Sequence, residues 1–337
     1  MDGGFARRKL LGILSASWLA QACYAVAQLG IPDLLAAGPR TAADLAAASG
    51  AHPEALRRLL RALAAAGVLR RTTAGQYELT AVGELLRSDV PGSLHQTAIM
   101  DGEEVYRAFA EIMYTVRTGR PAFDKVFGGS FYAYLDGDPR AADTFHAAMG
   151  GAGVPAAWAG RDLTGVGTLV DVGGGTGGLL AQTLAGHPAL RGILLELPDA
   201  IRRARPALTG AGVIDRVELV EGSFFDGVPA GADAYVLSRV LHNWTDERAA
   251  GILRRVRDAM PAGARLFVLE EFLPEEDDGP AAGLVDLLML VTLEGHDRTE
   301  AGYRALLEKA GFTVLAARLG GRPGVEGVIE ATRDADG

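Results

Sequence analysis

Short apolar runs alternate with helical segments from Gly165 onward, and this alternation constrains the fold more than any other feature. Five runs have the unbroken apolar character of strands that are buried on both faces: TLVDVG, GILLELP, RVELVEGS, ADAYVLS and RLFVLEEFLP. Helical segments lie between them. Such an alternation is typical of a doubly wound parallel sheet, whose ligands bind beyond the carboxyl ends of the strands. We therefore expect an α/β domain over residues 161–337.

The first 95 residues predict a separate, mainly helical domain. Thr41–Leu69 reads as two short helices, each ended by a glycine, and Pro53 opens the second helix at a favoured first-turn position. The run VLRRTTAGQYELT then predicts a β-hairpin around Ala74-Gly75, and Thr80 begins a further helix. Helix, helix and hairpin together are typical of a winged helix. Residues 96–160 are predicted to be a helical linker rich in aromatic side chains, which either pack in a core or line an apolar pocket for a flat ligand.

Three arginines on the second of these helices raise the question of DNA binding. Arg57, Arg58 and Arg61 are either a DNA-contacting set or the solvated face of an amphipathic helix whose leucines are buried. The chain has a formal net charge of -9, which gives no general attraction to phosphate backbones. We interpret the arginines as a solvated face and expect no nucleic-acid partner.

A stretch without charged residues runs from Leu10 to Pro32 and admits three interpretations. Its length and its basic flank suit a signal peptide or a membrane-spanning helix. Gln21 and Gln28 interrupt the apolar run, and burial in a subunit interface also explains a helix that is apolar on nearly all sides. A single cysteine, Cys23, excludes an intramolecular disulfide and suits a reducing compartment. We expect a cytoplasmic protein without a membrane partner.

A glycine-rich turn, DVGGGTGG from Asp171 to Gly178, lies between a predicted strand and a predicted helix. It matches the G-x-G-x-x-G pattern of dinucleotide sites through Gly173, Gly175 and Gly178. Asp171 argues against a dinucleotide, because a carboxylate there would repel a pyrophosphate but would suit an ammonium group. A second acid, Glu196, ends the next strand, where a carboxylate can bind a ribose diol. A nucleoside joined to a cationic amino acid fits these features, and S-adenosylmethionine is such a ligand.

With these motifs in order, the chain from about Leu10 to Ala331 resembles the dimeric class I S-adenosylmethionine-dependent O-methyltransferases. This family contains plant phenylpropanoid enzymes and bacterial natural-product enzymes, including enzymes of antibiotic biosynthesis. The resemblance implies a winged-helix dimerisation domain, a Rossmann-like catalytic domain, a homodimer and an aromatic small-molecule substrate. It also implies a set of cofactor-binding residues: Asp171, Gly173, Gly175, Glu196, Ser223, Phe224, Ser238 and Trp244. Ser223 departs from the family, which often has Asp at that position.

His242, in the segment SRVLHNWTDE, is the candidate general base. A phenol with a pKa of ~10 needs a base that is partly neutral at pH 7, and histidine with a reference pKa of ~6.5 meets that need. The family places its base in an H-x-W segment, which His242, Asn243 and Trp244 match. Many relatives have Asp in place of Asn243, and some bacterial relatives with Asn there lack the histidine and act by proximity.

A general base needs partners that fix its tautomer and stabilise its protonated form. By motif position, Glu270 and Asp297 correspond to the two acids that flank the histidine in the family. Asp297 replaces the commoner Glu and is one methylene shorter, so either the backbone lies closer or the contact is lost. No metal is expected, because the carboxylates follow the histidine-partner pattern and no second histidine has the spacing of a ligand.

The resemblance also names residues for the acceptor pocket. The family's F-x-x-x-M match is Phe145 and Met149, and Asn243 and Met289 are further candidates. Some relatives bind the same cofactor but catalyse hydroxylation, decarboxylation or pericyclic reactions. Retention of His242 with Glu270 favours methyl transfer, since those reactions need no proton acceptor there. A ligand-sensing DNA-binding protein and a nicotinamide dehydrogenase are the remaining alternatives.

Overall fold

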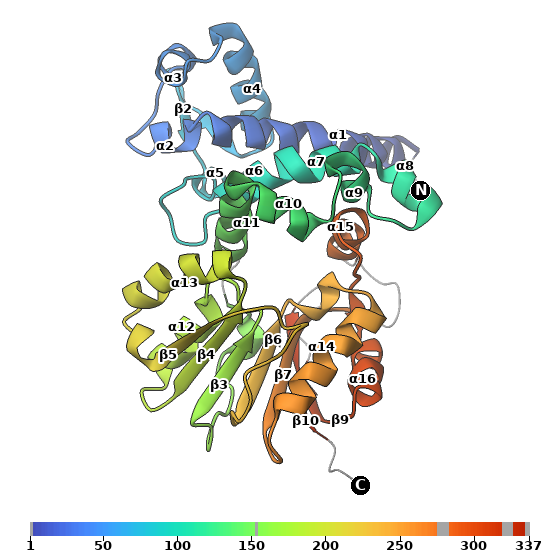
Figure 1. The fold of residues 1–337 in the computed structure, drawn as a ribbon. Helices are drawn as coiled ribbons and strands as arrows, with labels where there is room; N and C mark the ends of the chain where they lie inside the picture. Colours follow the sequence, from blue (N-terminus) through green and yellow to red (C-terminus); the bar gives the residue numbers. More distant parts are fainter. Residues whose placement is uncertain (1–2, 152–153, 275–282, 319–325, 334–337) are drawn as a thin grey trace. The chain divides into compact units, whose positions relative to one another are not determined.

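The computed structural model describes residues 3–151, 154–274, 283–318 and 326–333, and Figure 1 shows their fold. The chain divides into two compact units. The first comprises Met1–Ala110 and Asp138–Ala152, and the second comprises Glu111–Gly137 and Gly153–Gly337. Each unit therefore takes two separate segments of the chain. The domain boundaries predicted near residues 95 and 160 remain predictions.

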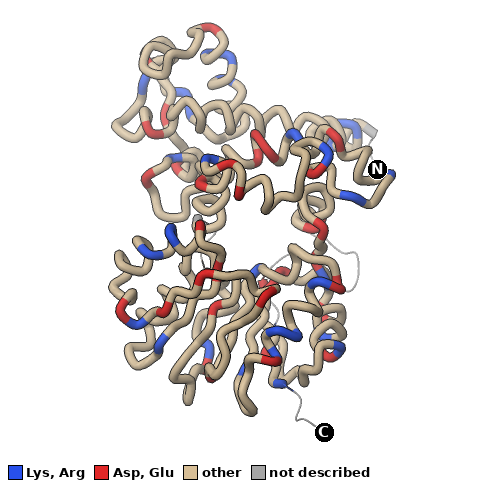
Figure 2. The backbone as a smooth tube through the Cα atoms, in the orientation of Figure 1, with Lys and Arg blue, Asp and Glu red and all other residues tan. Residues whose placement is uncertain are grey.

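The first unit is helical apart from one hairpin. Its elements are α1 (Gly3–Gln28), α2 (Ile31–Leu35), α3 (Ala42–Ser49), α4 (Pro53–Ala65), β1 (Leu69–Arg71), β2 (Tyr77–Leu79), α5 (Ala81–Glu84), α6 (His95–Met100), the π-helix η1 (Asp101–Val105), α7 (Tyr106–Phe109) and α11 (Pro139–Gly151). Lysines, arginines and acidic residues are interspersed within this unit, and the same is true of the second unit (Figure 2).

The predicted helix, helix and hairpin are confirmed. Thr41 caps α3 in a capping box with Asp44, and Gly50 ends the helix with a φ of 71°. Pro53 begins α4, as expected from its position. β1 and β2 pair antiparallel, and Gly75 turns the hairpin with a φ of 80°. Buried leucines and other apolar side chains from α1 to α5 form the core of this unit.

The carboxyl half of α1 is fixed to the π-helix η1 by close contact. A Cβ atom added to Gly102 would lie 2.2 Å from Cγ of Tyr24. The hydroxyl of Tyr24 and the side-chain amide of Gln28 donate hydrogen bonds to the Glu103 carboxylate over 2.9 and 2.6 Å. The amide of Gln21 donates to the Gly102 carbonyl over 3.0 Å. Glycine is therefore required at position 102 by the approach of the Tyr24 ring.

The second unit carries the sheet. Its elements are α8 (Ile112–Thr118), α9 (Ala122–Phe127), α10 (Phe131–Gly137), η2 (Ala156–Trp158), β3 (Thr168–Val172), α12 (Gly178–Gly186), β4 (Arg191–Glu196), α13 (Pro198–Gly210), η3 (Ile214–Arg216), β5 (Val217–Glu221), β6 (Ala234–Ser238), η4 (Leu241–Asn243), α14 (Asp246–Ala259), β7 (Arg265–Leu273), α15 (Leu284–Thr292), β8 (Arg298–Thr299), α16 (Glu300–Lys309), β9 (Phe312–Arg318) and β10 (Glu326–Arg333). The five strands expected from the apolar runs are all present as β3 to β7.

The predicted Rossmann-like doubly wound sheet is confirmed with one correction. Its strand order is β5-β4-β3-β6-β7-β10-β9, and β8 pairs with β7 outside this path. The strands from β5 to β7 pair in parallel, as expected. β10 instead runs antiparallel to both β7 and β9, so the sheet is mixed. The last strand in the chain inserts between two earlier ones, which no local pattern of the sequence indicates.

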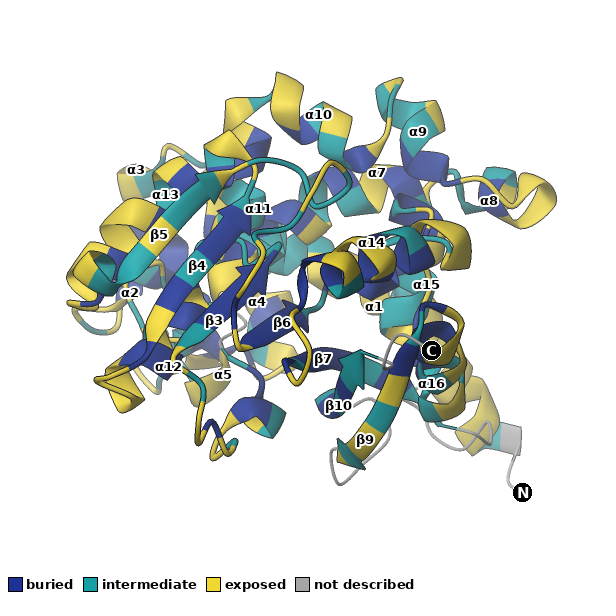
Figure 3. Ribbon diagram, turned by 60° about the horizontal axis from the view of Figure 1, so that its bottom comes forward, coloured by how far each residue is buried: buried dark blue, intermediate teal, exposed yellow. Residues whose placement is uncertain are grey.

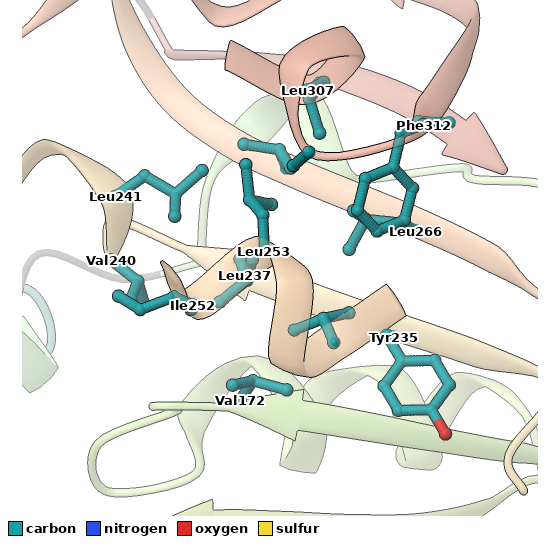
Figure 4. Close-up of a cluster of buried hydrophobic side chains, with 14 of the residues drawn as sticks. Val172, Tyr235, Leu237, Val240, Leu241, Ile252, Leu253, Leu266, Leu307 and Phe312 are labelled. Carbon is teal, nitrogen blue, oxygen red and sulfur yellow. The ribbon is translucent and has the colours of Figure 1, made fainter. Parts of the chain in front are cut away.

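Successive side chains along the central strands point to opposite faces of the sheet and belong to two cores, one on each face. Val170 and Leu237 belong to the core under α14 and α16, part of which is drawn in Figure 4. Leu169 and Val236, their chain neighbours, belong to the core under α12 and α13. Because both faces are covered, most residues of β6 and β7 are buried and none is exposed (Figure 3). The carboxyl ends of these strands are thus held by packing on both sides.

Replacement of Gly102 by alanine should destabilise the first unit by about 1–3 kcal/mol, because the new methyl group overlaps the Tyr24 ring. The free energy of unfolding in urea, followed by circular dichroism, measures the effect. Gly210→Ala is the matched control, since a Cβ there meets nothing within 4 Å at the end of α13. Equal stability of the two variants would show that Tyr24 does not press on position 102.

Candidate active site

The glycine turn after β3 lies directly on a buried carboxylate. Gly173, Gly175 and Gly177 have φ values of 71°, 57° and 76°, which residues other than glycine rarely adopt. Gly178, the third glycine of the sequence pattern, already begins α12 and has no positive φ. A Cβ on Gly174 would lie 2.3 Å from Cγ of Asp171. The turn therefore brings backbone against Asp171 without any side chain between them.

Asp171, the last residue but one of β3, and Glu196, the last residue of the neighbouring β4, are both poorly solvated. Asp171 is fully buried, and neither of its carboxylate oxygens has a hydrogen-bond partner among the described residues. Burial, and secondly the charge of Glu196, raise the pKa of Asp171 to about 7. Burial also raises the pKa of Glu196 to about 7, against hydrogen bonds from the backbone of Leu197 and Gly175. Two acids without a cationic partner suit a positively charged ligand, which would stabilise their ionised forms.

Aromatic side chains lie close to the same turn. The Phe224 ring, after β5, is 3.1 Å from the Cβ position of Gly173. Trp244, after η4, meets Phe225 edge-on at 4.8 Å between ring centroids, and its buried indole nitrogen has no hydrogen-bond partner among the described residues. Ser223 accepts a hydrogen bond from the Phe225 backbone over 3.2 Å, and Ser238 ends β6 in register with Leu269.

Tyr132, on α10, also lies among these aromatic residues, although the sequence analysis did not identify it as a site residue. Its ring stacks on Trp244 with 5.5 Å between centroids and 18° between planes. Burial and the charge of Glu196 raise its pKa, and a hydrogen bond with Asn243 opposes that rise. The available signal was the aromatic richness of the linker, which did not distinguish Tyr132 from its neighbours.

His242 lies between two buried carboxylates. It belongs to the short turn η4, and its Nδ1 is 3.1 Å from Oδ1 of Asp297 and 3.7 Å from Oε2 of Glu270. Glu270 is fully buried on β7, and its Oε1 accepts hydrogen bonds from the backbone N–H groups of Val240 and Leu241 over 3.1 and 2.8 Å. Asp297 therefore contacts His242, although its side chain is one methylene shorter than that of glutamate.

Opposing effects act on the protonation of His242. Burial alone would lower the pKa of His242, but the charge of Glu270 and the hydrogen bond and charge of Asp297 outweigh it, so that the pKa lies above its usual value. Burial raises the pKa of Glu270 in spite of the nearby imidazole. With Nδ1–H donating to a carboxylate, the basic lone pair is on Nε2.

The acceptor residues named from the sequence fall in both units. Phe145 and Met149 lie on α11 of the first unit, and Met149 is exposed. Met289 is buried on α15 of the second unit. The side-chain amide of Asn243 donates to the Arg239 carbonyl over 3.2 Å. Among the described residues, no group of three or more metal-ligating side chains is gathered.

Comparison with known proteins identifies the family. A family model described as an O-methyltransferase domain matches residues 109–313, more than half of the chain, and an O-methyltransferase dimerisation domain matches residues 11–89. The chain belongs to the O-methyltransferase family.

Relatives of this methyltransferase are similar over most of their length. Phenazine O-methyltransferase PhzM of Lysobacter antibioticus is 40% identical over 308 residues, which are 90% of this chain and 90% of that protein. The 8-amino-8-demethylriboflavin N,N-dimethyltransferase of Streptomyces davaonensis is 40% identical over 87% of this chain and 86% of its own. The structure of the O-methyltransferase NcsB1, in complex with S-adenosylmethionine and 2-hydroxy-5-methyl naphthoic acid, has a TM-score of 0.80 and 36% identity, covering 93% of this chain and 95% of that one.

These findings confirm the family, the fold and the cofactor expected from the sequence. The protein is an S-adenosylmethionine-dependent methyltransferase. The orphaned carboxylate of Asp171 fits this cofactor, because S-adenosylmethionine carries an ammonium and a sulfonium charge.

Asp171→Asn should remove a pH-dependent loss of stability in the methyltransferase without ligand. The folded pKa of Asp171 is about 7, above the ~3.9 of an unfolded Asp, so its contribution is present at low pH and is lost as pH rises towards 7. Between pH 5 and pH 8 the native protein should lose roughly 2 kcal/mol more unfolding free energy than the variant.

Chemical denaturation at the two pH values measures this difference. Asp215→Asn, at an exposed acid in η3, is the control and should follow the native protein. A parallel decline of native protein and Asp171→Asn would contradict the assignment of the loss to this carboxyl.

Proposed function

We propose that the enzyme transfers the methyl group of S-adenosylmethionine to a hydroxyl of an aromatic small molecule, with His242 as general base. The observation that carries the proposal is the placement of the His242 imidazole. Its Nδ1 lies within reach of Asp297 and Glu270, which leaves Nε2 as the basic atom. A second basic group with such an arrangement is not found among the described residues at the carboxyl ends of the strands.

The bound cofactor supplies a methyl group on a positively charged sulfur. Asp171 and Glu196 are proposed to bind its cationic and ribose groups, and the glycine turn to let the ligand approach the backbone of Gly173 and Gly175. Phe224, Trp244, Ser223 and Ser238 are proposed to complete the site. Because Ser223 stands where relatives often have Asp, a hydroxyl would there replace a carboxylate.

His242 would accept the proton of the acceptor hydroxyl at Nε2. The oxygen of that hydroxyl would take the methyl group from the sulfur of the cofactor held by Asp171 and Glu196, and a neutral thioether would remain. The imidazolium that results is stabilised by the charges of Glu270 and Asp297, at 3.7 and 3.1 Å from Nδ1. Exclusion of water by the buried setting of these residues strengthens that stabilisation.

The acceptor class is inferred from two independent supports. PhzM is named for a phenazine and NcsB1 holds a naphthoic acid, both flat aromatic molecules. In this chain, Tyr132 stacks on Trp244 close to the proposed base, so flat surfaces already line this part of the second unit. Asn243 and Met289, both in the second unit, are proposed as acceptor contacts, and the assignment of Phe145 and Met149 stays a prediction from the sequence. The riboflavin relative acts on nitrogen, so the choice of oxygen needs a direct test.

His242→Ala should reduce kcat by about 10²–10⁴, because a positioned base contributes that much to proton removal. In the native enzyme kcat/KM should rise with pH through a pKa above ~6.5, since the base must be neutral and its pKa is raised. Methyl-labelled cofactor with panels of phenols and aryl amines measures transfer, with His187→Ala at the C-cap of α12 as control.

Each result of this assay has a defined meaning. Full turnover by His242→Ala would exclude base catalysis and leave transfer by proximity. Label on the amines alone would assign nitrogen as the acceptor. Binding of the cofactor without any labelled product from the native enzyme would favour the non-methylating chemistry of some relatives.

The first unit is proposed to form a homodimer through α1. Phe5, Ile13, Leu14 and Trp18 on this helix are exposed, Trp18 at 74%. Residues Gly4–Gln28 also have the length and composition of a membrane-spanning helix. Of an apolar 18-residue stretch within them, 17% is buried. The match to a dimerisation domain over residues 11–89 favours a protein partner over a lipid one. A soluble, cytoplasmic homodimer is therefore proposed.

Trp18→Glu should convert the dimer to a monomer, because an exposed aromatic at an interface is replaced by a charge. Sedimentation velocity at micromolar concentration measures the change. Leu315→Glu on β9 replaces an exposed apolar residue of the second unit, 55% exposed, and should leave the dimer intact. Partition of the native protein into the membrane fraction would contradict the interface.

A further inference from the structure

The segment just before β8 lies against the turn that carries His242. A Cβ added to Gly295 would lie 2.0 Å from the His242 carbonyl oxygen and 2.4 Å from the Trp244 nitrogen. No side chain fits between the two backbones, so glycine permits their direct contact. The same segment continues to Asp297, whose carboxylate reaches Nδ1 of His242.

Arg298, the next residue, donates hydrogen bonds to the backbone on both sides of His242. Its guanidinium is almost completely buried, with 4% of the side chain exposed. One terminal nitrogen donates to the Leu241 carbonyl over 3.2 Å, and the other donates to the Trp244 carbonyl over 2.9 Å. Nε donates to Oδ1 of Asp246 over 2.9 Å, at the start of α14. The planar fork of arginine satisfies these acceptors together, which a lysine ammonium cannot do.

The turn η4 is held by its core residue Leu241, which is fully buried, and by hydrogen bonds to its backbone. It is a single 3₁₀ turn, closed by backbone bonds of 3.2 Å from Asn243 to Val240 and from Trp244 to Leu241. Glu270 accepts the N–H groups before His242, and Arg298 binds the carbonyls before and after it. Two adjacent residues thus act at one histidine, Asp297 on its ring and Arg298 on the backbone of its neighbours Leu241 and Trp244.

We propose that Arg298 is a positioning residue for methyl transfer, which fixes the backbone of residues 241–244 so that the imidazole of His242 faces the acceptor hydroxyl. The inference rests on the proposed function of His242 as base. No hydrogen bond or ion pair joins Arg298 to the imidazole within the described residues, and its effect on the reaction passes through the position of the turn.

An arginine elsewhere in the second unit provides a matched control. Arg216 donates to the carbonyls of Leu184, His187 and Leu190 over 2.8–3.0 Å, at the end of α12. It therefore binds backbone carbonyls as Arg298 does, but at residues that form no hydrogen bond with η4 in the described part of the chain. A lysine at either position keeps the charge and loses the fork.

The test compares Arg298→Lys and Arg216→Lys in the full-length enzyme, each in the native and in the His242→Ala background. Arg298→Lys should lower kcat roughly 10- to 100-fold, as expected for a small displacement of a catalytic group, and leave the KM for the cofactor within about 2-fold. In the His242→Ala background the same substitution should change kcat by less than about 2-fold, because the base through which it acts is gone. Arg216→Lys should leave kcat unchanged in both backgrounds.

The pH profile adds a readout that a loss of stability alone does not move. The charged groups that act on His242 are Glu270 and Glu271 of β7, Asp297 before β8 and Arg239 after β6. If the turn loosens, the Asp297 contact weakens and the pKa of His242 falls towards its usual value. The acid limb of kcat/KM should then move to lower pH in Arg298→Lys and stay in place in Arg216→Lys.

The outcomes separate this inference from the proposed function. Full activity of His242→Ala would overturn the base role and the positioning role with it. A loss in His242→Ala with an equal further loss from Arg298→Lys in both backgrounds would leave the base role and overturn the positioning role. If the lysine variant is insoluble, Asp246→Ala decides by the same comparison, since it removes the partner of Nε at a side chain that is 67% exposed.

Discussion

Parallel pairing of β3, β6 and β7 is the constraint on which the site depends. The register sets Asp171 opposite Val236 and Ser238 opposite Leu269, so these strands end at one edge of the sheet. Glu270 follows Leu269 directly and accepts the N–H groups of the chain that leaves β6. Backbone pairing, and not contacts among the side chains themselves, thus brings the residues proposed for cofactor binding and for base catalysis to one edge.

The site is built from groups that weaken the fold before a ligand arrives. Asp171 is fully buried and without a hydrogen-bond partner among the described residues, and burial raises its pKa to about 7. Its ionised form is therefore disfavoured in the folded protein. A cationic ligand reverses this, since it favours the charged carboxylate by direct attraction. Retention of such an acid in a core is explained by binding better than by stability.

Local patterns in the sequence predicted most of the second unit. The apolar runs located β3 to β7, and spaced glycines and acids located Asp171 and Glu196, because these signals come from neighbouring residues. The position of β10 between β7 and β9 was not predicted, since strand order depends on pairing between distant segments. Tyr132 and Arg298 were missed for the same reason. Their roles are defined by Trp244 and by the backbone of η4, which are far from them in sequence.

The close approach at Gly295 explains how an aspartate serves where the family commonly has glutamate. Asp297 is one methylene shorter, yet its carboxylate lies 3.1 Å from Nδ1 of His242. The segment before it rests on the backbone of residues 242–244 because Gly295 has no side chain, and the Asp297 N–H is held by Asp286 over 3.0 Å. The close position of the backbone at Gly295 therefore brings the short carboxylate of Asp297 within reach of the imidazole. Any larger residue at 295 would press the segment away from the turn, and a short carboxylate at 297 would then no longer reach the imidazole.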